Sequence, residues 1–209
     1  MIADATRRGT RPLAGLALAT VLALSTTSGC STSGGGKIVH TDDGFRITEA
    51  GSIRLGERSR FREATAALAA DDLDQAIERL EAATEASPDH AAPRINLAIA
   101  LRRTDRLEEA EQVLREAIAI HPRHIVAHNE LGLVYRRLGR LKDARSSYER
   151  AIALHSDFHV AHRNLGVLCD LFLDDSGCAL AHYRKTLEIV PDDADVAMWV
   201  QDLEQRRAQ

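Results

Sequence analysis

Histidine is the residue type whose number and spacing first suggest chemistry in this chain. The central part of the sequence contains His121, His124, His128, His155, His159 and His162. His124 and His128 stand four residues apart, which on a helix would place two imidazoles on one face with zinc-ligand spacing. However, the chain has no HExxH segment and no nearby carboxylate in ligand register. We therefore expect no metal site and no cofactor, with zinc binding by His124 and His128 as the alternative.

The sequence also lacks the residue groups on which enzyme activity usually depends. It has no phosphate-binding loop of the GxxxxGKS type, no nucleophile motif and no carboxylate pair in a plausible pocket. A formal net charge of −4 argues against a nucleic-acid binder driven by net charge. We expect no catalytic residues and a protein that works by binding.

Apolar side chains at regular intervals define the elements that position these residues. Small residues recur 34 positions apart at Ala64, Ala98, Gly132 and Gly166, as do Leu73, Leu107 and Leu141; Ala76, Ala110 and Ala144; and Ala83, Ala117 and Ala151. Pro88 and Pro122 keep the same period, and Ser156 replaces proline in the third copy. Pro191 comes one residue late, which places an extra residue in the turn at 173–177. A period of this length is typical of a stacked helical array.

The best copy of this pattern covers 125–158, with Leu131, Gly132, Tyr135, Ala144 and Tyr148 at its marked positions. It resembles the tetratricopeptide repeat (TPR), a pair of antiparallel helices. The resemblance implies an all-α, right-handed α-solenoid of about four helix pairs over 57–193. Residues 194–209 are expected to form a C-terminal capping helix. The stripe of this helix that faces the array would be Val196, Trp199, Val200 and Leu203.

The N-terminus resembles a bacterial lipoprotein signal over residues 1–29. Arg7, Arg8 and Arg11 precede an apolar run from Leu13 to Leu24, and small residues lead to Cys30. The resemblance implies a lipid on Cys30. It also implies an outer-membrane anchor with the repeats in the periplasm, because Ser31 and not aspartate follows the cysteine. The alternative is an ordinary cleaved signal.

Residues 30–56 are expected to form a tether and an N-terminal arm. The stretch 31–36 is polar and rich in glycine, as flexible linkers are. Two short β-prone runs, 37–41 and 45–48, flank the turn signal Asp42-Asp43-Gly44. We interpret 37–56 as an extended arm that folds against the first repeat or a partner. A disordered spacer is the alternative.

In the TPR family, the first helix of each pair lines a concave surface that holds a partner peptide. The positions that usually contact the partner correspond here to Ile95, Ile99, Arg102, Arg103, Asn129, Leu133, Arg136, Arg137, Arg163 and Val167. The resemblance implies an apolar floor flanked by arginines, suited to a peptide or helix with apolar anchors and carboxylates. The alternative is that the arginines only solvate helix ends. Of the carboxylate clamp in chaperone-binding members, only Asn96 is present, and Glu130 has the wrong sign.

The family resemblance also implies a cellular role. Envelope lipoproteins of this type assist pilus and secretin assembly or serve proton-driven envelope machines, so the expected partner is a protein of such a complex. The alternative is a structural module that self-associates into a homo-oligomer.

Two cysteines remain after Cys30 is assigned to lipid. Cys169 and Cys178 fall on facing positions of the fourth helix pair. In an oxidising compartment they would form a disulfide. Otherwise they would be two small buried apolar residues.

Overall fold

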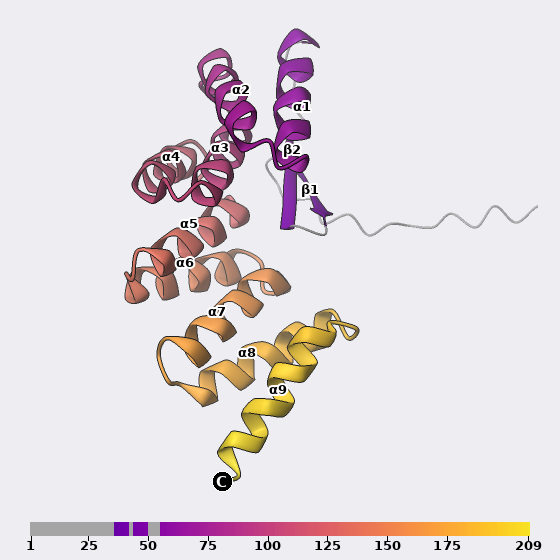
Figure 1. Cartoon of the computed structure of the whole chain (residues 1–209), viewed down its shortest axis with the longest axis vertical. Coiled ribbons are helices and arrows are strands. Elements are labelled where there is room, and N and C mark those ends of the chain that lie inside the picture. Colours follow the sequence, from indigo (N-terminus) through magenta and orange to yellow (C-terminus); the bar gives the residue numbers. More distant parts are fainter. Residues whose placement is uncertain (1–35, 42–43, 50–54) are drawn as a thin grey trace, which may run out of the picture.

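The computed structural model describes residues 36–41, 44–49 and 55–209, with side chains described from Ser59 onward. Figure 1 shows a short hairpin followed by helices stacked along one axis. The strands are β1 (Gly36–Thr41) and β2 (Gly44–Glu49), and the helices are α1 (Leu55–Ala69), α2 (Leu73–Ala86), α3 (Ala91–Arg103), α4 (Leu107–Ile120), α5 (Ile125–Arg137), α6 (Leu141–Leu154), α7 (His159–Leu171), α8 (Ser176–Ile189) and α9 (Ala194–Arg207). The expected signal peptide, Cys30 and most of the tether lie outside the described residues.

The helices form consecutive pairs, and each pair also packs against the next. Within pairs, α1 contacts α2, α3 contacts α4, α5 contacts α6 and α7 contacts α8. Between pairs, the second helix of one contacts the first helix of the next, up to α8 against α9. The predicted all-α solenoid is confirmed. Among the described helices, none is long and apolar enough to cross a membrane.

Each pair turns between its helices through one residue with positive φ. These residues are Asp71 (φ 60°), Asp105 (65°), Gly139 (72°) and Asp174 (50°). Aspartate tolerates the left-handed region better than most residues, because its short side chain bonds locally, and glycine enters it without strain. The fourth turn has four residues between its helices, and the turns within the other three pairs have three. This confirms that the extra residue of the fourth repeat lies in its turn.

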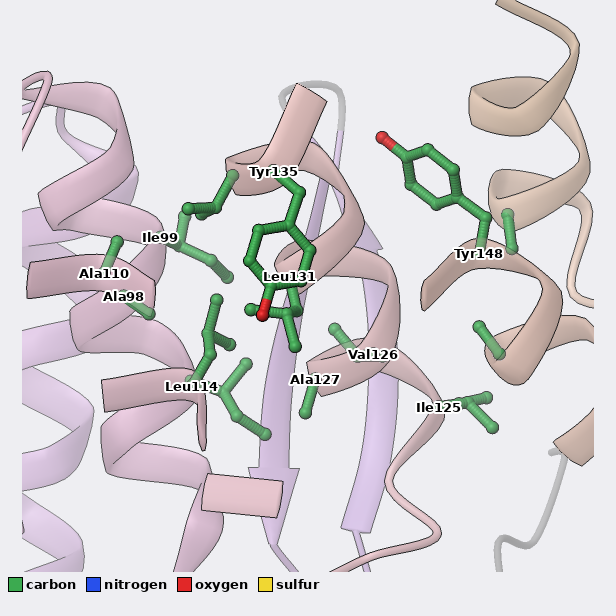
Figure 2. Close-up of a cluster of buried hydrophobic side chains, with 14 of the residues drawn as sticks. Ala98, Ile99, Ala110, Leu114, Ile125, Val126, Ala127, Leu131, Tyr135 and Tyr148 are labelled. Atoms are coloured by element: carbon green, nitrogen blue, oxygen red, sulfur yellow. The ribbon is translucent and has the colours of Figure 1, made fainter. Parts of the chain in front are cut away.

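The two helices of a pair pack against each other through one of two combinations of residues. In the first two pairs, a buried alanine on the first helix (Ala64, Ala98) is matched by a buried leucine on the second helix (Leu80, Leu114). In the third and fourth, Gly132 and Gly166 are matched by Tyr148 and Tyr183. A Cβ on Gly132 would lie 2.5 Å from the Tyr148 ring, and one on Gly166 would lie 2.5 Å from the Tyr183 ring. The glycines are therefore required by the tyrosines. Figure 2 shows the buried side chains around α5, with Tyr148 among them.

Helix α9 closes the array. Val196 and Leu203 are buried, and Trp199 and Val200 are partly buried against the array. The Trp199 ring lies 5.5 Å from that of Tyr183. Gln201, Asp202 and Glu204, on the remaining surface of α9, are exposed. A polar outer face lets the last helix end the stack in water.

Candidate partner-binding surface

Two of the clustered histidines, His124 and His128, have structural partners. His124 caps α5, where its Nδ1 accepts a hydrogen bond from the Ala127 N–H at 3.4 Å. The His128 Nε2 lies 2.9 Å from the Pro122 carbonyl. Burial is the main cause that lowers the pKa of His124, to about 4, and it also lowers the pKa of His128. The described residues contain no cluster of three or more side chains able to hold a metal ion.

Sequence reasoning missed a pair formed by His162 on α7 and His182 on α8. Their Nδ1 atoms lie 2.9 Å apart, and the His162 Nε2 lies 2.9 Å from the Ser156 carbonyl. If His162 donates from Nε2, its Nδ1 accepts from His182. This arrangement joins the two helices of the fourth pair. No 34-residue repetition accompanies His182, so little in the sequence signals the pair.

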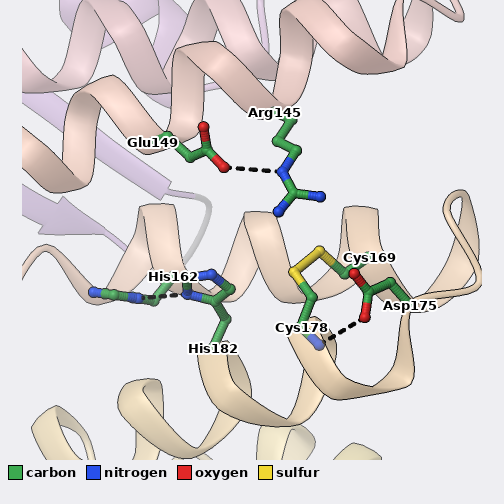
Figure 3. Close-up of a disulfide and its surroundings, with 7 residues drawn as sticks. All are labelled: Arg145, Glu149, His162, Cys169, Asp175, Cys178 and His182. Atoms are coloured by element: carbon green, nitrogen blue, oxygen red, sulfur yellow. Dashed lines mark hydrogen bonds and ion pairs between the residues drawn. A yellow bond between two sulfur atoms is a disulfide. The ribbon is translucent and has the colours of Figure 1, made fainter.

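A disulfide joins the same two helices near their connecting turn. Cys169 on α7 and Cys178 on α8 are bonded, with Cα atoms 5.9 Å apart. Figure 3 shows the bridge beside Asp175, whose carboxylate accepts a hydrogen bond from the Cys178 N–H at 2.9 Å. The fourth pair therefore has a covalent link next to its longer turn.

Two of the predicted groove arginines bind the preceding helix pair. Arg103 donates to the Leu68 carbonyl at 3.1 Å and to the Asp71 carboxylate at 2.5 Å. Arg137 repeats this one pair later, donating to the Arg102 carbonyl and to Asp105 at 2.7 Å. We call this arrangement the arginine latch. The signal was present in the sequence, because Asp71 and Asp105 keep the same 34-residue spacing as the two arginines.

Two further groove arginines are also engaged within the chain. Arg102 donates to Glu130 at 3.1 Å, and Glu130 is almost fully buried. Arg163 lies 3.3 Å from Asp195 and 4.9 Å above the Trp199 ring centroid, so it ties α7 to α9. Their main contacts therefore stabilise the stack.

The apolar floor is accessible over only part of its predicted length. Ile95 is 0% exposed and Ile99 is 9% exposed, and β2 packs against α3, which carries both. Asn129 is also 0% exposed, and its Oδ1 accepts a hydrogen bond from Asn164 at 2.9 Å. Ile95 and Asn129 present no surface in this structure, and their contact with a partner stays a prediction. Strand β2 of the arm packs against the second pair, whereas the sequence suggested the first.

The remaining predicted positions, on α5 and α7, stay accessible. Leu133 and Val167 are half-buried. Arg136 is also partly exposed, and its guanidinium lies 5.7 Å above the ring centroid of Phe172. Phe172 and its neighbour Leu171 are 47% and 68% exposed. No carboxylate in the described part of the chain lies within ion-pair distance of Arg136. The sequence did not single out Phe172, because it follows the last position of the helical pattern.

This architecture places the chain among the helical-repeat solenoids. Two family models described as tetratricopeptide repeat match it, one over residues 67–129 and the other over 125–158. The chain therefore contains tetratricopeptide repeats over residues 67–158. Among proteins with curated descriptions, none matches the sequence.

Solved structures of similar fold come from several bacteria. TTC0263, a thermophilic TPR protein of Thermus thermophilus, is 28% identical, with a TM-score of 0.64 over 71% of this chain and 81% of that one. The pilF protein of Pseudomonas aeruginosa is 21% identical, with a TM-score of 0.67 over 73% of this chain and 69% of its own. MamA from Desulfovibrio magneticus RS-1 is 20% identical, with a TM-score of 0.58 over 66% and 77%. At 21% and 20% identity, the last two similarities concern the fold alone.

Proposed function

We propose that this protein is a non-catalytic interaction scaffold that binds a peptide or helix of a partner protein on the concave side of α5 and α7. The observation that carries the proposal is the uneven exposure of the predicted contact positions. Ile95 and Ile99 on α3 are buried, whereas Leu133 on α5 and Val167 on α7 retain accessible surface. The chain's own β2 packs on α3, which favours the later pairs as the place where an incoming segment binds.

We further propose that Cys30 carries lipid and holds the array at the outer membrane, facing the periplasm. The support is the signal-like sequence of residues 1–29 and the polar segment after Cys30. Several acyl chains on one cysteine would anchor the protein stably, unlike a single chain. In this setting the scaffold would aid assembly of an envelope complex, such as a pilus and secretin or a proton-driven machine.

The test is a crosslinking pull-down from intact envelopes that compares Arg136→Glu with Arg150→Glu. Arg150 is exposed on α6 and has no ion pair in the described residues, so it is a matched control. The latch arginines are left intact, because reversing their charge would disturb the stack itself. We expect the wild type and Arg150→Glu to capture the same protein and Arg136→Glu to lose it. Equal capture by all three would contradict binding on α5 and α7.

Self-association is the alternative function, and light scattering separates it from the scaffold. A homo-oligomer would grow in mass with protein concentration, whereas a scaffold for another protein would keep a constant mass. The lipid anchor is tested separately, by metabolic labelling with a palmitate analogue. Labelling of the wild type and of Cys30→Ala to the same extent would contradict it.

A further inference from the structure

The junction between the third and fourth helix pairs lacks the arginine latch. Arg103 and Arg137 have their equivalent in Leu171, 34 residues on, and Asp71 and Asp105 have theirs in Gly139. Both partners of the latch are thus replaced together. At the next junction an arginine returns, because Arg206 of α9 donates to Asp170 at 3.0 Å. Among the junctions of the described array, only the third has no such bond.

The residues at this junction expose apolar surface where the latch would otherwise lie. Leu171 and Phe172 are two of the three large apolar side chains that are exposed in the described part of the chain, the third being Met198. Most large apolar side chains of a stacked array are covered by neighbouring helices, so two adjacent exposed ones mark a docking surface. Val167, one turn earlier on α7, is half-buried.

Arg136 adds an unneutralised cation to the same surface. Its guanidinium lies over the Phe172 ring, and the described part of the chain offers it no carboxylate. By contrast, Arg94, Arg102, Arg103, Arg137 and Arg163, the other arginines of α3, α5 and α7, are each within 4 Å of a carboxylate. A partly desolvated guanidinium binds a carboxylate more strongly than one in open water. The complementary partner therefore carries an acidic side chain.

We propose that Arg136, Leu171 and Phe172, which we call the third-junction patch, bind a partner segment in which an aspartate or glutamate lies close to a leucine, isoleucine or phenylalanine. The acidic group pairs with Arg136, and the apolar side chain covers Leu171 and Phe172. This inference rests on the proposed scaffold function and specifies the chemistry of the segment that it binds.

The experiment is a selection of random 16-residue peptides displayed on phage, with the full-length chain as bait. Enriched peptides are then synthesised with a fluorescent label, and their Kd values are measured by anisotropy. One variant, Gly139→Asp with Leu171→Arg, rebuilds the latch, using an aspartate that the fold already accepts at positive φ in other turns. The second variant is Arg136→Gln. The control is Arg150→Gln. The Arg150 charge acts on His128 near the start of α5, whereas Arg136 lies at the end of that helix.

We expect enriched peptides to pair an acidic with an apolar residue. Their Kd should be about tenfold higher for Arg136→Gln than for the wild type, because this variant loses one charge-assisted hydrogen bond. Binding should disappear in the rebuilt-latch variant and stay unchanged in Arg150→Gln. Circular dichroism melts check that each variant folds.

Peptides that bind all variants equally, or that lack acidic residues, would overturn the patch while leaving the scaffold function standing. If the selection yields no binder, both proposals fail. If the wild type self-associates and the rebuilt-latch variant does not, the third-junction patch binds a second copy of this chain. That result would also overturn the proposal.

Discussion

At the scale of single residues, Gly132 and Tyr148 form a matched pair. A methyl group on Gly132 would overlap the Tyr148 ring, so Gly132→Ala should destabilise the protein by about 1–3 kcal/mol. Tyr148→Leu alone should also be costly, because it leaves a cavity. The double variant recreates the Ala98 and Leu114 pair of the second repeat, so it should recover part of the loss. Urea unfolding of the two single variants and the double variant measures this coupling. Additive losses would contradict a direct contact.

A second residue-scale prediction concerns His124 and pH. Burial lowers its folded-state pKa to about 4, below its ordinary value of 6.5. The unfolded chain therefore binds a proton first as pH falls. The stability due to neutral His124 is complete above about pH 6.5 and is lost as pH falls toward 4. We expect urea unfolding to give a free energy of unfolding that is lower at pH 5 than at pH 7.5, with about 1–2 kcal/mol of the difference due to His124. His124→Asn keeps a capping side chain and should remove that drop. An unchanged pH dependence would exclude His124 as its source.

At the scale of elements, the disulfide links α7 to α8 beside the longest of the turns within pairs. Reducing it should lower the free energy of unfolding of this pair by about 2–3 kcal/mol, since the closed loop is short. Hydrogen exchange before and after reduction would measure the effect helix by helix. We expect protection to fall in α7, α8 and α9, with little change in α3 and α4, because contacts are mostly between neighbours.

The Cys169→Ala, Cys178→Ala double variant provides the control for this experiment. It should resemble the reduced wild type and be insensitive to the reductant. A loss of protection on reduction in this variant as well would show that the reductant acts elsewhere.

At the scale of the whole molecule, β2 of the hairpin packs against α3 of the second pair. Deleting residues 36–49 should uncover part of α3, because β2 packs against this helix. We expect hydrogen exchange to accelerate in α3 while α7 and α8 stay protected. A uniform change along the array would contradict local packing of the hairpin.

Much of the whole architecture could be predicted from periodicity. Alanines 34 residues apart indicated the helix pairs, because small side chains are needed wherever helices approach closely. The binding surface was harder to predict. Family positions indicate which residues face the concave side, but they do not show that Arg103 and Arg137 are used by the stack itself. The packing of β2 on α3 depends on a tertiary contact between segments that share no repeat, so no sequence pattern predicted it.

The missing latch at the third junction also has a mechanical consequence. A stacked array bends most easily at an interface that lacks charged cross-links, and in the described array the junction between α5 and α7 has no arginine–carboxylate bond. The first three pairs should thus move as one stiff rod, and the fourth pair with α9 as another. Arg136 lies on the first rod and Phe172 on the second, on either side of the bending line. A partner segment bound to both residues would link the two rigid parts and fix the curvature of the solenoid.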